Sequence, residues 1–417
     1  MEKMDHDIAI IGAGIIGCAC AYRLQQAGFR VVLLDKEAPG QGASFGNAGH
    51  IATEQIMPLA NPQMLTQIPS MLLDPLGPLR IDWRYFPRLM PWMLKLVANM
   101  RAEAQQRSRA GLIQLNQASL AAWKQLLADM GGEDLMQHQG SLLVFEQAKT
   151  GEALNQFART LAANGVAVNP LTKQALHQQV PGLAEGVIGA LDFPETSHVI
   201  DPHRLVIRLM AAARELGMTY RQQEVTGGFV TDQGVELTTP QGPVRASRVL
   251  VAAGAFSQSL VYQLTDVHIP LDTERGYHLM LPKEADRIPV AVSSAERRFI
   301  MTPMQGGLRL AGTVEFAGLD RPANMARAHR LADLGDALFE HSLDLAGAMP
   351  WMGCRPSLPD SLPIIDAVGP EQRVLLALGH HHLGLTQAAI TAQLITELAR
   401  QQTPGLDLSA YRLSRFH

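Results

Sequence analysis

The sequence is poor in the residues that mark secreted, disulfide-bonded proteins. Its 417 residues contain three cysteines, Cys18, Cys20 and Cys354, and only 5% aromatic residues. Three cysteines cannot form a disulfide framework, and the first two lie too close together in a predicted helix to bridge. We therefore expect a reducing compartment and a cytoplasmic protein.

The sequence also lacks an excess of basic charge and a long apolar run. Its 35 Lys and Arg against 39 Asp and Glu give a net charge of −4, which offers no electrostatic footprint for nucleic acid. The uncharged apolar run at residues 8–22 is interrupted by three glycines and is too short for a membrane-spanning helix. The first residues lack a secretory signal pattern, so we expect neither a signal peptide nor a transmembrane anchor.

What is present begins with a nucleotide-binding pattern. An apolar run at residues 8–11 is followed by a glycine turn, a predicted helix and a second apolar run at residues 31–34, which ends on Asp35. Strand, glycine turn, helix, strand and acid in this order form the dinucleotide fingerprint, in which the acid accepts hydrogen bonds from ribose hydroxyls. This motif alone does not distinguish FAD from NAD.

Each glycine of the turn has its own task. Gly12 permits the tight turn, Gly14 lets a pyrophosphate approach the backbone, and Gly17 allows the helix to pack closely on the strand. The helix then offers its N-terminal N–H groups to the phosphates.

The rest of the chain predicts two interleaved domains. We expect an α/β fold in which residues 1–57, 196–262 and 347–417 form a Rossmann-like domain. Residues 58–195 and 263–346 form an inserted α+β substrate domain on a mostly antiparallel sheet, since residues 271–315 read as strands and turns. Residues 58–101 are rich in proline and aromatic residues; they are either a cover over the active site or an apolar surface for peripheral membrane contact.

Four segments, residues 43–50, 249–257, 353–360 and 379–386, together resemble the D-amino-acid oxidase superfamily of flavoenzymes. The Ser-Phe-x-Asn-Ala-Gly and Gly-His-x-x-Leu-Gly-x-Thr patterns are most similar to those of bacterial D-amino-acid dehydrogenases. The resemblance implies noncovalent FAD that extends across both domains, with the isoalloxazine ring at their interface.

The resemblance also assigns cofactor contacts. Those on the ADP half are Gly12, Ala13, Gly14, Ile15, Ile16, Asp35 and Lys36, and those nearer the ribityl chain and flavin are Ser44, Asn47, Ala48, Gly49 and His50. Val225 matches a backbone contact with adenine, Ala253 and Gly254 match a further glycine contact, and Gly384, Leu385 and Thr386 match the backbone at the flavin pyrimidine. A helix that begins near Gly384 directs its positive end at the ring, where negative charge collects on reduction.

Arg355 is the predicted substrate-binding residue, because a guanidinium matches a carboxylate bidentately. The resemblance agrees, and the alternative is an interdomain ion pair with Asp360. Tyr277 and His278 lie on a predicted strand that faces the flavin, and Tyr277 is a second candidate donor to the carboxylate.

The run of histidines at residues 380–382 does not predict a metal site, since three successive residues cannot face one ion. We expect one of them, taken as His382, to face the flavin or substrate. Cys354 is close to a segment that attaches flavin covalently in sarcosine-oxidase relatives, but the spacing differs. Arg309 falls where those oxidases carry a lysine, which favours a dehydrogenase.

The predicted activity is oxidation of an amino acid, of D configuration by resemblance and with proline or hydroxyproline as a candidate. A hydride passes to flavin N5, and electrons pass to a quinone or another acceptor. Three alternatives stay open: a sarcosine- or glycine-type oxidase that uses oxygen, an NAD-dependent dehydrogenase, and a noncatalytic flavin subunit of a larger complex.

Overall fold

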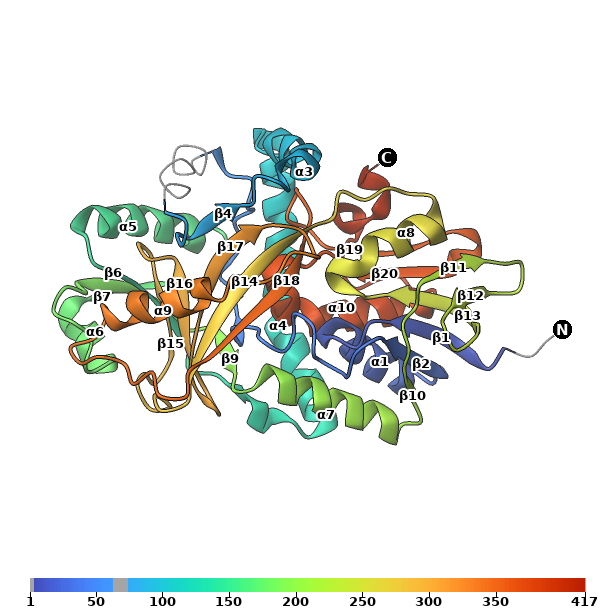
Figure 1. The fold of residues 1–417 in the computed structure, drawn as a ribbon, viewed down its shortest axis with the longest axis horizontal. Coiled ribbons are helices and arrows are strands. Elements are labelled where there is room, and N and C mark those ends of the chain that lie inside the picture. Colours follow the sequence, from blue (N-terminus) through green and yellow to red (C-terminus); the bar gives the residue numbers. More distant parts are fainter. Residues whose placement is uncertain (1–3, 63–73, 417) are drawn as a thin grey trace.

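The computed structural model describes residues 4–62 and 74–416. It has two lobes, each built around its own β-sheet (Figure 1). Part of the predicted segment 58–101, residues 63–73, lies outside the described residues.

The first lobe contains an eight-stranded sheet in which β10, β2, β1, β13 and β20 run parallel. Its strands are β1 (His6–Ile11), β2 (Val31–Asp35), β10 (Thr219–Gln222), β11 (Gly227–Val230), β12 (Val235–Thr238), β13 (Val244–Val251), β19 (Ile364–Val368) and β20 (Val374–Leu378). The helices against it are α1 (Ile15–Gln26), α7 (Pro202–Glu215), α8 (Ser257–Thr265) and α10 (Gly384–Ala399). The continuous apolar runs of β1 and β2 are buried on both faces, as a parallel sheet requires.

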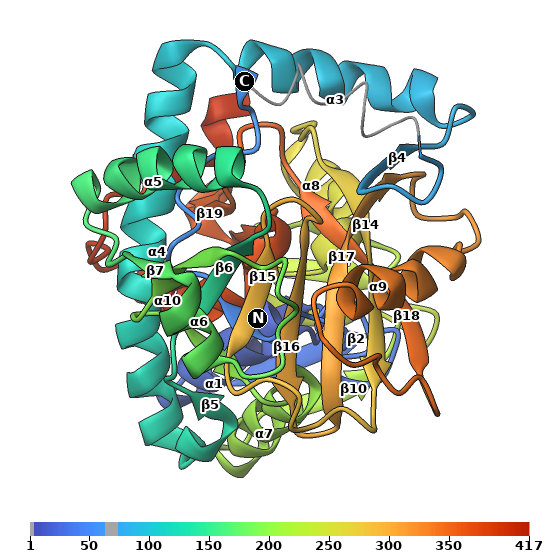
Figure 2. The same cartoon turned by 90° about the vertical axis from the view of Figure 1, so that its left-hand side faces the viewer.

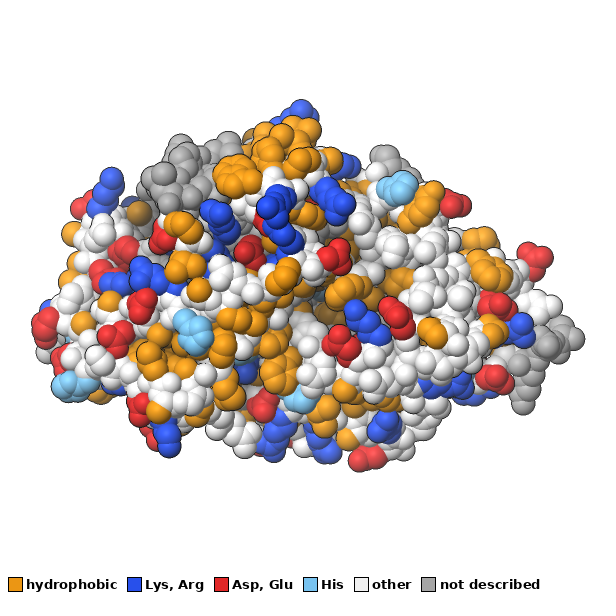
Figure 3. Space-filling view, in the orientation of Figure 1, with side chains coloured by type: hydrophobic (Ala, Val, Ile, Leu, Met, Phe, Trp, Pro, Cys, Tyr) orange, Lys and Arg blue, Asp and Glu red, His pale blue; other side chains and the backbone are white. Residues whose placement is uncertain are grey.

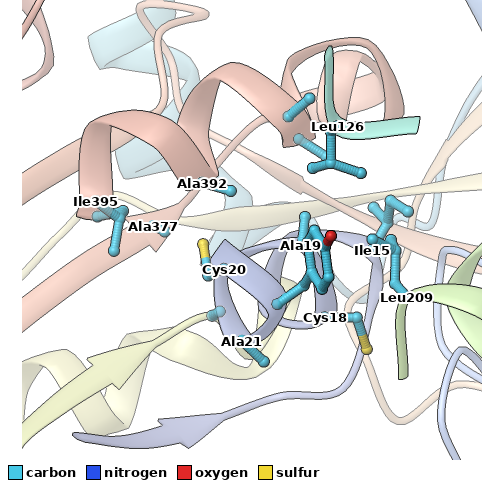
Figure 4. Packing of buried hydrophobic residues seen from close by; sticks show 14 of the residues in the cluster. Ile15, Cys18, Ala19, Cys20, Ala21, Leu126, Leu209, Ala377, Ala392 and Ile395 are labelled. Atoms are coloured by element: carbon cyan, nitrogen blue, oxygen red, sulfur yellow. The ribbon is translucent and has the colours of Figure 1, made fainter. Parts of the chain in front are cut away.

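The core of this lobe surrounds α1 (Figure 4). Cys18 and Cys20 point to different sides of α1, and both are free thiols in its apolar surroundings. The long helix α4 (Ala102–Met130) adds Leu126 and Trp123 to the same core.

The second lobe contains a nine-stranded sheet with mostly antiparallel neighbours. Its strands are β4 (Leu79–Ile81), β6 (Ser141–Phe145), β7 (Asn169–Thr172), β8 (Gly189–Phe193), β14 (Asp272–Leu281), β15 (Ala291–Ser294), β16 (Phe299–Met304), β17 (Gly307–Phe316) and β18 (Met349–Ser357). The helices of this lobe are α3 (Phe86–Ala98), α5 (Ala148–Ala163), α6 (Lys173–Gln179) and α9 (Ala326–Asp336), and α9 covers the face of β14 and β17 away from the first lobe (Figure 2). A small sheet of β3 (His50–Ile51), β5 (Met136–Gln137) and β9 (Ser197–Val199) completes the structure.

The predicted fold class is confirmed: a Rossmann-like parallel sheet carries an inserted domain on a mostly antiparallel sheet. Two elements that the sequence analysis assigned to one domain lie in the other lobe of the structure. Strand β18, placed by sequence in the first domain, pairs along its length with β14 of the second sheet. Helix α4, placed in the second domain, packs on α10 of the first, because the apolar stripe of a helix does not specify which sheet it will cover.

The predicted proline-rich segment contains a regular helix that the sequence interpretation missed. Helix α3 has a proline in its first turn, where the missing N–H costs nothing, and a second, Pro91, inside it. Within the part of the chain that the structure describes, none of the helices is long and apolar enough to cross a bilayer.

Candidate active site

A cavity of about 1110 Å³ lies between the two lobes. The carboxyl ends of β1, β2, β13 and β20 open into it, which is where parallel α/β sheets bind ligands. Residues of β14 and β18 line the opposite side. The cavity therefore joins a nucleotide-binding edge to one face of the second sheet.

The glycine turn is closely packed. Gly12 has a φ of +110°, and a Cβ there would lie 2.4 Å from the Ala252 carbonyl oxygen. A Cβ at Gly17 would lie 1.8 Å from the Gly12 carbonyl oxygen, so α1 can approach the end of β1 only because Gly17 lacks a side chain. The geometry fits a pyrophosphate bound against bare backbone.

Two polar side chains face this turn. Asp35 Oδ2 accepts a hydrogen bond of 2.6 Å from the Ala13 N–H, and Ser44 Oγ accepts one of 2.9 Å from the Ile15 N–H. The Lys36 ammonium lies 4.1 Å from the centroid of the Phe256 ring. Asp35 thus stands at the end of β2 beside the glycine turn, within the cavity wall.

Most of the predicted cofactor residues line this one cavity. They are Gly12, Ala13, Gly14, Ile15, Ile16, Asp35, Lys36, Ser44, Asn47, Ala48, His50, Val225, Ala253, Gly254, Gly384 and Leu385. Gly49 and Thr386 lie behind the lining: the Gly49 N–H donates to Asn47 Oδ1, and Thr386 Oγ1 accepts from the Ala52 N–H at 3.0 Å.

The end of the cavity near α10 carries a helix N-terminus. Helix α10 begins at Gly384, and no side-chain hydrogen bond caps it. The buried indole of Trp123 on α4 holds the first turn by donating to the Leu385 and Thr386 carbonyls. The first amides of α10 are therefore fixed toward the cavity and suit an electron-rich ring edge.

On the second sheet, the cavity wall is formed by alternate residues of the paired strands β14 and β18, whose side chains point to the same face. Glu274 pairs with Arg355, and Gly276 with Gly353. A Cβ at Gly276 would lie 2.2 Å from Arg355 Nη2, so the guanidinium rests directly on the glycine backbone. The two glycines therefore make room for the Arg355 guanidinium and the Trp351 ring on the cavity face.

A bulge in the neighbouring strand supports Arg355. The register of β14 and β17 shifts between Arg275 and Tyr277, and Thr313 there has a φ of +60°. The Thr313 carbonyl accepts a hydrogen bond of 3.2 Å from Arg355 Nη1. Bulges commonly re-aim groups beside active sites, and this one turns a carbonyl toward the guanidinium.

Arg355 remains cationic in this setting. Burial lowers the pKa of its guanidinium, and the nearby Glu274 carboxylate opposes that effect. The alternative partner, Asp360, instead accepts a hydrogen bond from Arg415 Nε at 2.7 Å. The alternative interdomain pair between Arg355 and Asp360 therefore does not form in the part of the chain that the structure describes.

The structure does not bring the Tyr277 hydroxyl or the His278 ring to Arg355. Tyr277 OH donates to Glu315 Oε2 at 2.6 Å, on the opposite face of the sheet, because successive residues of a strand alternate in direction. The His278 ring stacks on Trp351 with centroids 5.0 Å apart, and its Nδ1 lies 3.0 Å from the Gly46 carbonyl. Both side chains therefore interact with other protein groups and not with Arg355.

Trp351 is a site residue that sequence reasoning missed. Its ring occupies the space that a Cβ at Gly46 or Gly353 would need, and it lines the cavity. The signal was available, because Trp351, Gly353 and Arg355 alternate along β18 and so share one face.

The three successive histidines have different surroundings. His380 Nε2 lies 3.0 Å from Thr391 Oγ1, and His381 Nε2 lies 3.2 Å from the Leu358 carbonyl, so both rings are held by the protein. His382 opens into the cavity, with Nε2 2.6 Å from Gln55 Oε1. The His382 ring is exposed within the cavity; partial desolvation by the cavity walls lowers its pKa, and the nearby His381 and Arg355 add to this effect.

Two further candidates can be placed. Cys354 is a free thiol at the cavity wall, and burial raises its pKa. Arg309 Nη1 donates to the Asn47 carbonyl at 2.5 Å, so this guanidinium braces the loop that precedes β3. Within residues 4–62 and 74–416, no group of three His, Cys, Asp or Glu side chains is arranged to hold a metal ion.

Comparisons with known proteins agree with this geometry. The model of the "FAD dependent oxidoreductase" (DAO) family matches residues 7–398. A D-amino-acid oxidase of Bradyrhizobium diazoefficiens is 31% identical, and a D-amino acid dehydrogenase of Paramagnetospirillum magneticum is 28% identical, each over 98% of both chains.

Solved structures share the fold. A glycine oxidase from Geobacillus kaustophilus superposes with a TM-score of 0.72 at 22% identity, covering 98% of both chains. An L-proline dehydrogenase from P. horikoshii superposes with a TM-score of 0.74 at 17% identity, covering 99% of this chain and 98% of that one.

Proposed function

The chain belongs to the DAO family of FAD-dependent oxidoreductases, and we propose that it oxidises a D-amino acid and passes the electrons to a quinone or another acceptor. FAD is the cofactor. The observation that carries the proposal is Arg355: a half-buried cation in the cavity wall, resting on Gly276, with one hydrogen bond to the Thr313 carbonyl among the described residues.

The cavity residues fit FAD from end to end. The glycine turn and Asp35 would hold the ADP half, and the N-terminus of α10 would face the flavin pyrimidine. Gly276 and Gly353 let the Arg355 guanidinium and the Trp351 ring lie flat against the cavity wall. The bound flavin supplies a hydride acceptor at N5.

The protein contributes binding and orientation. The guanidinium of Arg355 would bind the substrate carboxylate in a bidentate manner and so fix the α-carbon. The neutral amine supplies the electrons that expel the α-hydrogen as hydride. The imino acid product then hydrolyses to a keto acid, or stays cyclic if the substrate is proline or hydroxyproline.

The first experiment is anaerobic mixing of the holoenzyme with pairs of D- and L-amino acids, including proline and hydroxyproline, while the visible flavin spectrum is recorded. We expect one D compound to bleach the flavin and its L partner to leave it unchanged. Bleaching by L compounds alone would contradict the chirality, and a protein that never bleaches would favour the noncatalytic subunit.

The names of the relatives favour the D configuration, but they divide between oxidase and dehydrogenase. Arg309, in place of the lysine expected of an oxygen-using relative, supports the dehydrogenase. Its guanidinium is committed to the Asn47 carbonyl. Stoichiometric peroxide formation during aerobic turnover would instead establish the oxidase.

Peripheral contact with a membrane from the cytoplasmic side is the second part of the proposal. Trp83, just before α3, is 62% exposed, and Leu94 and Val97, one turn apart on α3, are 65% and 50% exposed. Hydrophobic side chains gather over α3 with basic residues nearby (Figure 3), among them Arg88 and Lys95. An apolar face with basic flanks suits an anionic lipid surface.

Vesicle sedimentation tests this contact. We expect the protein to bind phosphatidylglycerol vesicles more than phosphatidylcholine vesicles, and Leu94→Glu with Val97→Glu to abolish the binding. Leu345→Glu, at a half-exposed leucine outside α3, is the matched control. Equal sedimentation of all three proteins would rule out this surface.

A further inference from the structure

Glu274 is a buried acid in the wall of the large cavity, and the chemistry proposed above does not use it. It is 3% exposed, and it lines the cavity together with Arg355. The two residues are paired directly across β14 and β18, so their side chains leave the same face of the sheet. A carboxyl group therefore stands next to the residue that is proposed to bind the substrate carboxylate.

The two side chains extend in opposite directions along the strands. The Arg355 guanidinium lies over Gly276, where an added Cβ would be 2.2 Å from Nη2. Glu274 Oε1 instead accepts a hydrogen bond of 2.8 Å from Ser357 Oγ, and Ser357 lies on the other side of the pair, opposite Asp272. A two-residue step along a strand spans roughly 7 Å, so the carboxyl and the guanidinium are separated by a distance of that order.

One oxygen of Glu274 is left for a ligand. Ser357 donates to Oε1, and His381 Nδ1 lies 3.5 Å from the same oxygen. Oε2 has no hydrogen-bond partner among the described residues, and it is not one of their atoms that are sealed from solvent without a partner. Because an unpaired charge is costly to bury, a carboxylate in this position favours a ligand that brings a positive donor.

We propose that Glu274 selects amino acids whose side chain ends in a cation, an ammonium or a guanidinium. When Arg355 binds the substrate carboxylate, the α-nitrogen stays close to that group, whereas an extended side chain can reach the Glu274 end of the cavity. Contact of Glu274 with the α-nitrogen would also stabilise its ammonium form, which has no lone pair to expel the hydride. This inference rests on the proposed function and names the substrate class of the same site.

Two substrates of equal shape test this selection. D-Ornithine and D-norleucine differ only at the end of the side chain, which is an ammonium in the first and a methyl group in the second. We expect the second-order rate constant of anaerobic flavin reduction in the wild-type holoenzyme to be about 10²-fold higher for D-ornithine, the effect of one buried charge pair. Glu274→Gln should abolish this preference and leave reduction by D-alanine, whose methyl group is too short to reach Glu274, unchanged.

The variant keeps the internal contact of this position, because a glutamine oxygen can still accept the hydrogen bond from Ser357. Flavin content and Tm verify folding. Glu195→Gln is the matched control, since Glu195 is an exposed acid outside the large cavity, and it should keep the wild-type preference. Equal rates with both substrates in the wild type would overturn the selection, and so would an equal loss for D-alanine and D-ornithine in Glu274→Gln.

Binding without oxidation supplies a second readout. δ-Aminovalerate is D-ornithine without the α-amine, and hexanoate is its counterpart with a terminal methyl group. Perturbation of the visible flavin spectrum measures the binding of both, and we expect the wild type to bind δ-aminovalerate more tightly and Glu274→Gln to bind both alike. Equal binding by the wild type would overturn the selection. If this difference holds but no D-amino acid reduces the flavin, the proposed function is contradicted and the recognition of a cation by Glu274 is not.

Discussion

The two faces of the strand pair β14 and β18 each carry an arginine, Arg275 fully buried on one and Arg355 half-buried on the other, with different consequences. Arg275 donates to the carbonyls of Gly318, Pro322 and Arg321, and it lies 3.6 Å from Glu315. On the cavity face, Arg355 makes one hydrogen bond, to the Thr313 carbonyl, among the described residues. A buried cation with fixed partners supports the fold, whereas one with unused donors is ready for an anionic ligand.

The strongest test of this comparison is Arg275→Met. Removal of the guanidinium leaves Glu315 buried without its cationic partner and the backbone carbonyls without their donor, so we expect the free energy of unfolding to fall by about 3–5 kcal/mol. Urea denaturation of the holoenzyme measures it. A stable variant with normal turnover would contradict the structural role of Arg275.

Arg355→Met should have the opposite effect to Arg275→Met: activity should fall while stability stays near that of the wild type. We expect kcat/KM to fall about 10²- to 10³-fold, because the substrate carboxylate loses its bidentate partner, which corresponds to about 3–4 kcal/mol. Flavin content and Tm should stay near wild type. Recovery of affinity for amines that lack a carboxylate would identify the lost contact, and unchanged kcat/KM would exclude Arg355 as the carboxylate site.

Gly276→Ala adds one methyl group against Arg355 and tests whether the exact position of the guanidinium matters. Its Cβ would lie 2.2 Å from Arg355 Nη2, so the guanidinium must move within the cavity. We expect KM to rise about tenfold, by about 1.4 kcal/mol, with little change in Tm. Steady-state kinetics decide this, and a variant with wild-type KM would show that the position of Arg355 is not critical.

Residues on the two faces of β14 should also contribute differently to the change of protein stability with pH. Burial, with a contribution from Arg309, lowers the pKa of His278 to about 3, whereas the pKa of Tyr277 on the other face is raised to about 12, first by burial and then by Glu315. The folded state thus binds fewer protons at His278 than the unfolded chain, whose histidine has a pKa near 6.5. Stability from His278 is present above pH 6.5 and is lost as the pH falls toward 3.

This effect contributes up to about 1.4 kcal/mol per pH unit within that window. We expect His278→Gln to flatten the fall of Tm between pH 6.5 and 4, and Tyr277→Phe to leave the slope unchanged. Identical slopes for His278→Gln and wild type would show that the histidine does not link folding to pH.

The nucleotide side of the molecule could be predicted from local sequence. The Gly12 turn needs a positive φ and close backbone approach, and Asp35 must end the next strand, so residue type and spacing carry the information. Arg355 could be predicted in the same way, from its motif.

The substrate side depended on contacts between distant segments. The direction of Tyr277 depends on which strand face packs against α9, and Trp351 reaches Gly46 from more than three hundred residues away. The side on which α4 packs depends on the same long-range arrangement.

The sequence by itself determined the dinucleotide turn, the alternation of the strands and the order of the family motifs, because steric limits on glycine and strand periodicity act over a few residues. Only the tertiary structure decided which buried arginine keeps free donors and which histidine meets a carboxylate. Those outcomes depend on the burial and hydrogen-bond partners that chain folding brings together, and no short segment of sequence contains them.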